Sequence, residues 1–174
     1  MEKSKQRSII LLGLMGSGKT IIGKNIAKKL NYTFYDTDTL IEQKQEKTIN
    51  EIFKTFGEKY FRKIEEEIIL RVLNEPLSVI SLGGGSILSP KIRKKLKKNS
   101  FTIYLKVKID ILVKRLKNSK KRPLLSNVDI KKKLITIHSN RKKYYEDANL
   151  TINNSESIQD TIIEIVNYLS KKNE

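Results

Sequence analysis

The chain contains no cysteine and only one histidine, His138, among its 174 residues. Without cysteine it can form neither a disulfide framework nor a thiol-based active site, and this composition fits a cytoplasmic enzyme. A single histidine excludes metal sites built from several histidines, so we expect His138 to be a packing or surface residue. No run of apolar residues approaches the roughly 18 that span a membrane, so no membrane partner is expected. The first residues, MEKSKQRS, precede only a short apolar stretch, and we expect no signal peptide.

Acidic residues are scarce beside basic ones, at 19 against 36, which gives a formal net charge of +17. The imbalance is strongest between Lys91 and Lys143, where 20 of the basic residues occur with only Asp110 and Asp129. Such a stretch can form a nucleic-acid-binding face, but Ile92 and Leu96 keep a helical spacing that places the lysines toward solvent. The basic residues also lack the interleaved aromatic side chains of single-strand binders. We therefore expect no nucleic-acid partner, and a charge that attracts anionic substrates.

The most specific motif is GLMGSGKT at residues 13–20, which fits the phosphate-binding pattern G-x-x-x-x-G-K-[ST]. The apolar run Ile9–Leu12 precedes it as a predicted buried strand, and a helical pattern with Ile22 and Ile26 follows it. In this context the glycines let backbone N–H groups and a helix N-terminus face an anion. An ordinary glycine-rich turn would not need all eight pattern positions. The predicted nucleotide-binding residues of this loop are Gly16, Ser17, Gly18, Lys19, Thr20 and Ile21.

Strand and helix patterns alternate along the whole chain, which is typical of an α/β fold with a parallel sheet. Further strands are predicted at Thr33–Tyr35, Leu77–Leu82, Phe101–Val107 and Leu150–Ile152. We expect a single domain over residues 1–174, a five-stranded parallel sheet flanked by helices on both faces, and a mobile lid at about 118–127. Ligands of such sheets bind beyond the carboxyl ends of the strands.

A phosphate-binding loop alone does not identify the class of enzyme. The guanine-reading pattern N-K-x-D is absent, which argues against a GTPase. Asp36 and Asp38 follow the second predicted strand, and alternate positions on an extended segment point the same way. One aspartate can then hold Mg²⁺ through water while the other faces an acceptor hydroxyl. The alternative is a pair of turn aspartates that cap the next helix.

Three other groups of residues can carry chemistry. Arg62 and Glu65 share a helix face, so a braced guanidinium can recognise a carboxylate, although a surface ion pair is the alternative. Gly83–Gly85 ends the third strand and lets backbone N–H groups approach a ligand, unless it is only a flexible turn. Arg122, in the predicted lid, can reach a transferring phosphoryl group or stay solvated, and Arg141 can be one more exposed helix charge.

Taken in order, these motifs resemble the shikimate kinase family along essentially the whole chain. The matching segments are GLMGSGKT at 13–20, DTD at 36–38, FRKIEEE at 61–67, SLGGGSI at 81–87, RPLL at 122–125 and RKKYYEDANLTI at 141–152. The resemblance implies a P-loop kinase fold with a mobile lid. It also implies ATP-dependent phosphorylation of shikimate to shikimate 3-phosphate, with release of ADP, in aromatic amino acid biosynthesis. Mg²⁺ would be required, and we expect a monomer whose partners are ATP and shikimate.

The resemblance also implies roles for individual residues. Catalysis would fall to Lys19, Asp38 and Arg122, with Asp38 binding the shikimate hydroxyls as candidate base. Thr20, in place of the commoner serine, would ligate Mg²⁺, and Asp36 would support the metal through water. The implied shikimate-binding residues are Asp38, Arg62, Glu65, Gly84, Gly85 and Arg141.

Within this set Arg62 and Arg141 would hold the shikimate carboxylate, with Glu65 orienting Arg62. Arg115 matches a position that stacks near adenine, and Arg122 also belongs to the nucleotide-binding set. Two alternatives stay open. One is a related kinase for a gluconate-like hydroxy acid, and the other is a nucleic-acid-binding P-loop module.

Overall fold

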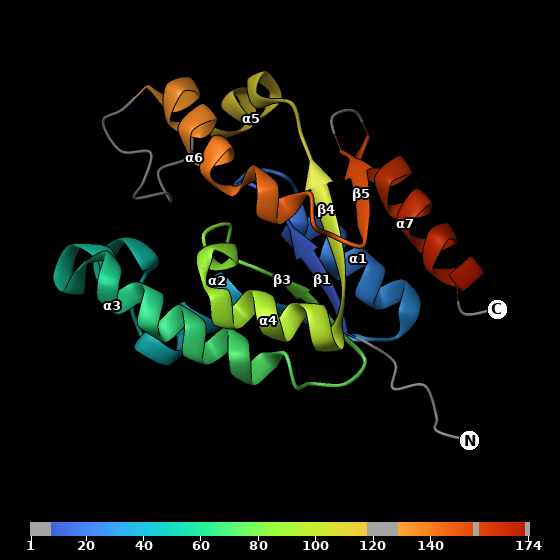
Figure 1. Ribbon diagram of the computed structural model, residues 1–174, viewed down its shortest axis with the longest axis horizontal. Coiled ribbons are helices and arrows are strands. Elements are labelled where there is room, and N and C mark those ends of the chain that lie inside the picture. The colour runs from blue at the N-terminus through green and yellow to red at the C-terminus, as the bar shows by residue number, and fades with distance from the viewer. Residues whose placement is uncertain (1–7, 118–128, 155–156, 173–174) are drawn as a thin grey trace.

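The computed structural model describes residues 8–117, 129–154 and 157–172. The predicted lid at 118–127, with Arg122, lies outside these ranges. Within them the chain forms a five-stranded sheet with helices on both faces, as the alternating sequence pattern predicts (Figure 1).

The sheet has the strand order β2-β3-β1-β4-β5, and every neighbouring pair is parallel. The central strand β1 (Ser8–Leu12) is buried along its length, and its Ile9 pairs with Val79 on one side and with Phe101 on the other. The remaining strands are β2 (Thr33–Asp36), β3 (Ser78–Ser81), β4 (Ser100–Lys106) and β5 (Leu150–Asn153). Because all the strands are parallel, their carboxyl ends lie at one edge of the sheet.

Alternate side chains of the strands enter two separate apolar cores. Ile10 and Leu12 of β1 pack with α3 (Ile49–Val72), α4 (Pro90–Asn99), α5 (Ile109–Leu116) and α6 (Ile130–Tyr145). Ile9 and Leu11 pack on the opposite face with α1 (Lys19–Leu30) and α7 (Ile158–Lys172). A strand that is buried on both faces reads as a continuous apolar run, which is the pattern of this sequence.

The helix ends follow the local chemistry of the chain. Gly18 caps α1 in a left-handed conformation with φ 88°, and Ser89 caps α4 with Pro90 in the first turn. Thr48 and Glu51 form a capping box at the start of α3. Gly57 interrupts α3 with φ 78° and ψ 173°, so the helix is kinked at this residue.

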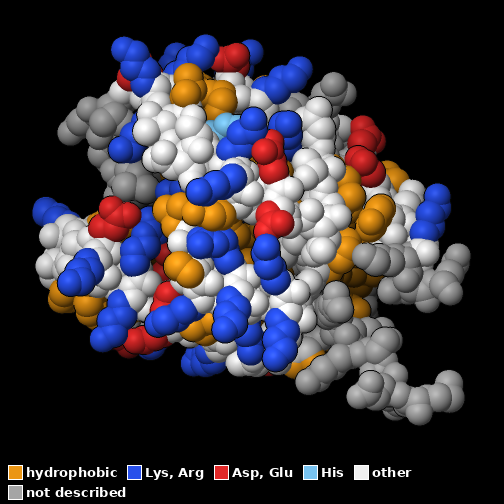
Figure 2. Space-filling model, viewed as in Figure 1, with side chains coloured by type: hydrophobic (Ala, Val, Ile, Leu, Met, Phe, Trp, Pro, Cys, Tyr) orange, Lys and Arg blue, Asp and Glu red, His pale blue; other side chains and the backbone are white. Residues whose placement is uncertain are grey.

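The basic side chains of α4 and α6 cover one outer face, while Ile92 and Leu96 of α4 point inward (Figure 2). The expected division into a wet and a buried helix face is therefore confirmed. Some of the surface charge is paired, as in Lys97 Nζ to Asp147 Oδ2 at 2.7 Å and Lys131 Nζ to Asp110 Oδ1 at 2.7 Å. Among the described residues, no helix is both long enough and apolar enough to cross a membrane.

Candidate active site

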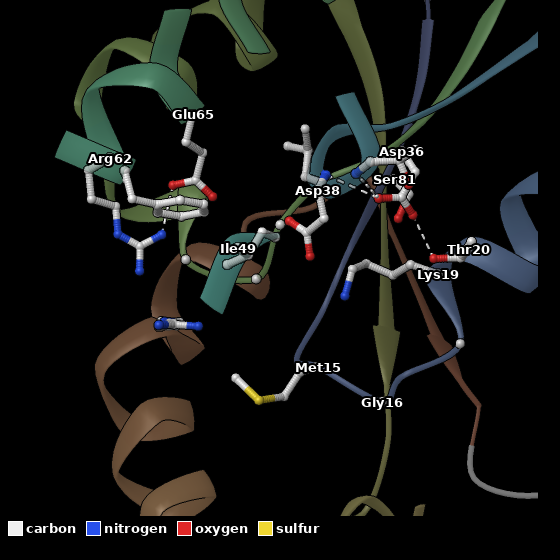
Figure 3. Close-up of a pocket in the computed structure, with 18 of the residues that line it drawn as sticks. Met15, Gly16, Lys19, Thr20, Asp36, Asp38, Ile49, Arg62, Glu65 and Ser81 are labelled. Carbon is white, nitrogen blue, oxygen red and sulfur yellow. Dashed lines mark hydrogen bonds and ion pairs between the residues drawn. The ribbon is translucent and has the colours of Figure 1, made fainter. Parts of the chain in front are cut away.

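The loops at the carboxyl ends of the strands enclose a cavity of about 440 Å³. Figure 3 shows Arg62 and Glu65 at one end of it and Thr20 at the other, with Asp38 and Lys19 between them. The residues that line it come from the phosphate-binding loop, the start of α2 (Thr37–Gln45), α3, the glycine triplet after β3, and α6. The fold therefore brings distant predicted motifs to one space.

The phosphate-binding loop has a conformation that needs glycine. Gly13, Gly16 and Gly18 have φ values of 145°, 78° and 88°, which side chains with a Cβ rarely adopt. Lys19 Nζ donates hydrogen bonds to the carbonyl groups of Gly13 and Leu14, each at 3.0 Å. The ammonium group thus lies across the mouth of its own loop, where an incoming phosphate would meet it.

Asn154, directly after β5, holds this loop from outside the cavity, and sequence reasoning missed it. Its side chain is fully buried, donates from Nδ2 to the Ser17 carbonyl at 2.6 Å and accepts from the Thr161 hydroxyl at 3.0 Å. Arg115 donates to the Gly16 carbonyl at 3.2 Å and to the Asn154 carbonyl at 3.4 Å. Arg115 therefore lies beside the nucleotide loop but does not line the cavity.

Asp36 connects the phosphate-binding loop to α2. Its Oδ2 accepts a 2.6 Å hydrogen bond from the Thr20 hydroxyl, and its Oδ1 accepts from the backbone N–H groups of Asp38 and Thr39. Asp36 is thus the N-cap of α2, as the alternative interpretation proposed. The expectation that both aspartates lie on an extended segment was wrong, because Asp38 is already in the first helical turn. Both still line the cavity, since α2 begins at its wall.

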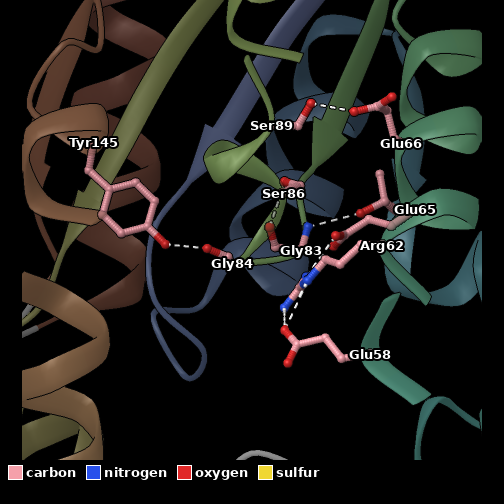
Figure 4. A network of polar contacts seen from close by, with 10 residues as sticks. Glu58, Arg62, Glu65, Glu66, Gly83, Gly84, Ser86, Ser89 and Tyr145 are labelled. Carbon is pink, nitrogen blue, oxygen red and sulfur yellow. Dashed lines mark hydrogen bonds and ion pairs between the residues drawn. The ribbon is translucent and has the colours of Figure 1, made fainter. Parts of the chain in front are cut away.

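The ion pair between Arg62 and Glu65 is buried rather than exposed on the surface. Glu65 is 2% exposed, and its Oε2 accepts from Arg62 Nη1 at 2.7 Å. Glu58, one turn earlier, accepts from Arg62 Nε at 3.2 Å and from Nη2 at 3.0 Å. Two carboxylates therefore fix the guanidinium, and Figure 4 shows it between them. The surface-pair alternative is wrong for Glu65, and Glu58 was not predicted.

The environment of Glu65 changes its acidity. Burial raises the pKa of its carboxyl group to about 7, and the neighbouring Asp38 adds to this rise. The guanidinium groups of Arg62 and Arg141 act in the opposite direction, because they favour the charged form. Glu65 is therefore a weaker acid than an exposed glutamate in the unliganded protein.

Each glycine of the triplet lies against a different functional group. A Cβ on Gly83 would be 2.8 Å from both Asp38 Oδ1 and Glu65 Oε1, and one on Gly85 would be 2.5 Å from Arg62 Nη1. A Cβ on Gly84 would be 3.4 Å from Arg141 Nη1. Any larger residue in the triplet would therefore meet the charged groups of the cavity. The flexible-turn alternative does not account for this close packing.

Arg141 also departs from the expectation of an exposed helix charge, because it is only 5% exposed and lines the cavity. Tyr145, one turn later on α6, donates from its hydroxyl to the Gly84 carbonyl at 2.6 Å (Figure 4). His138 lies apart from the cavity, with Nε2 at 3.3 Å from the Tyr104 hydroxyl, so its expected packing role is confirmed.

Apolar side chains close the cavity between its charged ends. Phe53 and Phe61 pack with ring centroids 4.6 Å apart, and Met15 and Ile49 complete this wall. Sequence reasoning missed these four residues, since an apolar residue on a helix or in a loop reads as ordinary core. Apolar side chains beside the charged groups lower the local dielectric constant and so strengthen their electrostatic interactions.

The structure brings most of the predicted site residues together and leaves a few apart. Those that line the cavity are Gly16, Gly18, Lys19, Thr20, Ile21, Asp36, Asp38, Arg62, Glu65, Gly84, Gly85 and Arg141. Ser17 is buried behind the loop and Arg115 lies beside it. Arg122 is outside the described residues. Within those residues, no group of three or more His, Cys, Asp or Glu side chains is placed to hold a metal ion.

Comparisons with known proteins agree with this geometry. A family model described as shikimate kinase matches residues 15–170. A shikimate kinase of Bartonella henselae is 42% identical over 161 residues, which cover 92% of this chain and 76% of that protein. The solved structure of a shikimate kinase from Acinetobacter baumannii in complex with shikimate matches with a TM-score of 0.92 at 30% identity, over 95% of this chain and 94% of that one.

The gluconate-type alternative receives support at the level of the fold alone. The structure of a gluconokinase from Sinorhizobium meliloti 1021 matches with a TM-score of 0.58 at 15% identity, over 98% of this chain and 99% of that one. At such low identity the shared feature is the arrangement of strands and helices.

Proposed function

The chain belongs to the shikimate kinase family, and we propose that it transfers the γ-phosphoryl group of ATP to the 3-hydroxyl group of shikimate. The products are shikimate 3-phosphate and ADP. The observation that carries the proposal is one cavity with a phosphate-binding loop at one end and two arginines, Arg62 and Arg141, at the other. Such a cavity suits an acceptor that bears both a carboxylate and a hydroxyl group.

The acceptor end positions the substrate. Arg62, held by Glu58 and Glu65, presents a pre-organised guanidinium, and Arg141 supplies a second positive charge. The two arginines bind the shikimate carboxylate and so direct the ring hydroxyls toward Asp38, in the middle of the cavity. Positioning of this kind supplies much of the rate enhancement in phosphoryl transfer.

The transfer step takes place between Asp38 and Lys19. Asp38 accepts the proton of the attacking hydroxyl group, whose oxygen forms the new bond to the γ-phosphorus as the bond to the β-phosphate oxygen breaks. Lys19 stabilises the negative charge on the phosphate oxygens. Arg122 is proposed to contribute further positive charge, and Arg115 to lie near the adenine.

Thr20 and Asp36 would hold Mg²⁺, and the chain's own contacts suit this role. The Thr20 hydroxyl donates a 2.6 Å hydrogen bond to Asp36 Oδ2, which leaves the lone pairs of the hydroxyl oxygen available to a cation. A metal bound by one hydroxyl, phosphate oxygens and water does not need a cluster of carboxylates, and Mg²⁺ in kinases keeps several waters. When bound, Mg²⁺ neutralises charge on the β- and γ-phosphates.

We also propose that the protein acts as a monomer in the cytoplasm. The described residues of one chain line the cavity from both ends, so this part of the site needs no second subunit. Neither a nucleic acid nor a membrane is a partner in this proposal, because the cavity accommodates a small anion and part of the surface charge is paired internally.

A coupled assay of ADP release tests the function. The full-length protein is given ATP and Mg²⁺ with shikimate, gluconate, a nucleoside monophosphate or no acceptor in parallel. We expect turnover with shikimate alone, and loss of that turnover in Lys19→Ala without a change in the circular dichroism spectrum. Turnover with gluconate in preference to shikimate would transfer the assignment to the hydroxy-acid alternative.

A further inference from the structure

Tyr145 is a buried residue that touches the acceptor end of the cavity without lining it. It ends α6, is 1% exposed, and reaches across 61 residues of sequence to the Gly84 carbonyl at 2.6 Å. Figure 4 shows its hydroxyl pointing at the glycine triplet from the side opposite Arg62. The triplet is thus bordered on one side by the Arg62 ion pair and on the other by Tyr145.

Arg141 lies beside the same hydroxyl, since a Cβ placed on Gly84 would be 3.4 Å from Arg141 Nη1 and 3.6 Å from the Tyr145 hydroxyl oxygen. Burial raises the pKa of Tyr145, and the nearby Arg141 guanidinium opposes that rise. A phenolic group has one proton to donate and lone pairs to accept with. It donates to the Gly84 carbonyl, which leaves its lone pairs free to accept from the neighbouring Arg141 guanidinium.

The ring of Tyr145 is held independently of its hydroxyl. It stacks on Tyr104 with centroids 5.1 Å apart and an interplanar angle of 17°. The Tyr104 hydroxyl lies 3.3 Å from His138 Nε2, and neither of these residues lines the cavity. The stacked pair therefore contains one hydroxyl group directed at the site and one directed away from it.

We propose that Tyr145 is a positioning residue for the acceptor, and that its hydroxyl fixes both the Arg141 guanidinium and the Gly84 backbone. The inference rests on the proposed function, in which Arg141 binds the carboxylate of shikimate. An unbraced arginine side chain samples many rotamers, and ordering it on binding costs free energy that a pre-positioned group avoids. Arg62 has two carboxylates for this purpose, and Tyr145 gives Arg141 a neutral brace.

A neutral brace has a specific consequence for binding. A third carboxylate beside Arg141 would compete with the anionic acceptor for the guanidinium. A phenolic oxygen directs the arginine with no such competition, because the uncharged group leaves the positive charge available to the ligand.

The pair Tyr145→Phe and Tyr104→Phe provides a matched test. Each substitution removes one hydroxyl from the same stacked pair and leaves the rings to pack. In Tyr145→Phe the shikimate KM should rise about tenfold, the usual effect of losing a hydrogen bond to a charged group, while the ATP KM stays within about twofold. Tyr104→Phe should leave both constants unchanged. Thermal unfolding of both variants checks that each is folded at the assay temperature.

Several results would overturn the inference. A shikimate KM in Tyr145→Phe equal to that in Tyr104→Phe would remove the positioning role. Equal increases in the KM for shikimate and for ATP would indicate a general loss of structure. A wild-type protein with no shikimate turnover would instead refute the proposed function, so the two failures are distinguishable.

A double-mutant cycle with Arg141→Lys tests the route of the effect. Lysine cannot reproduce the planar guanidinium that the hydroxyl orients. If Tyr145 acts through Arg141, adding Tyr145→Phe to Arg141→Lys should raise the shikimate KM by clearly less than the tenfold seen alone. Full additivity would contradict action through Arg141.

Discussion

A single methyl group added at Gly85 should separate acceptor binding from folding. The Gly85 backbone has φ −92° and ψ −18°, which alanine adopts without strain. The new Cβ would lie 2.5, 2.7 and 2.8 Å from Nη1, Nη2 and Cζ of Arg62. Van der Waals contact at this kind of atom pair begins near 3.4 Å, so the guanidinium must retreat by almost an ångström.

The atoms that must move are at the end of the flexible Arg62 side chain, so we expect Gly85→Ala to lower activity more than stability. Arg62 cannot retreat and also keep its 2.7 Å contact with Glu65 Oε2. A displacement of about 1 Å in a positioning group can cost up to about 100-fold in rate. We expect kcat/KM for shikimate to fall between about 10-fold and 100-fold in Gly85→Ala, with the ATP KM unchanged.

Two measurements check this prediction. Steady-state kinetics by coupled ADP release give the constants for each substrate, and urea unfolding gives the stability. We expect the free energy of unfolding to change by less than about 1 kcal/mol, because the three nearest atoms all belong to the end of the Arg62 side chain. Unchanged shikimate kinetics in a folded Gly85→Ala protein would refute the placement of Arg62 against the triplet. A large loss of stability would instead show that Arg62 cannot move.

Four further predictions address other parts of the site. Asp38→Asn should lower kcat by about 100-fold or more, since the base is lost, while Asp36→Asn should chiefly raise the Mg²⁺ requirement, and the reverse pattern would exchange their roles. Because burial raises the pKa of Glu65 to about 7, the shikimate KM should rise as the pH falls below 7. Protonated Glu65 holds the Arg62 guanidinium less firmly, and Glu65→Gln should remove this pH dependence. The same raised pKa means that, between pH 4.5 and about 7, the folded state binds a proton at Glu65 that the unfolded state has released. The free energy of unfolding should therefore decrease as the pH rises through that window. A pH series of urea unfolding measures this decrease, and Glu65→Gln should abolish it. Asn154→Ala should raise the ATP KM and destabilise the fold by about 1–3 kcal/mol, because the Ser17 carbonyl loses a buried donor, and an unaltered ATP KM would contradict its role at the loop.

The fold could be predicted from the sequence because local and tertiary preferences agree. Apolar runs mark the buried strands, and the predicted strands Thr33–Tyr35 and Leu150–Ile152 are each one residue shorter than β2 and β5. The error at Asp36 and Asp38 has a physical cause. β2 ends at Asp36, which is also the N-cap of α2, so no connecting segment separates the strand from the helix. The expected extended segment therefore included Asp38, which belongs to the first turn of α2.

The missed site residues depend on tertiary contacts that sequence spacing does not encode. Tyr145 and Asn154 act across 61 and 137 residues, respectively, and each is an ordinary polar residue at the end of an element. Glu58 was closer to prediction, since it stands four residues before Arg62 on the same helix. Its importance becomes evident only when Arg62 is known to face a cavity.

The buried charges at the acceptor end are better explained by binding than by stability. Removing a carboxylate and a guanidinium from water costs free energy that their attraction repays incompletely, and an apolar pair of similar volume is often at least as stable. The raised pKa of Glu65 is a direct sign of this cost, because burial is its largest cause. Arg62 and Arg141 line the cavity beside Glu65, so an anionic acceptor would restore part of the solvation that the two guanidinium groups have lost. The arrangement is incomplete without a ligand carboxylate, and that incompleteness favours binding of an acceptor with one.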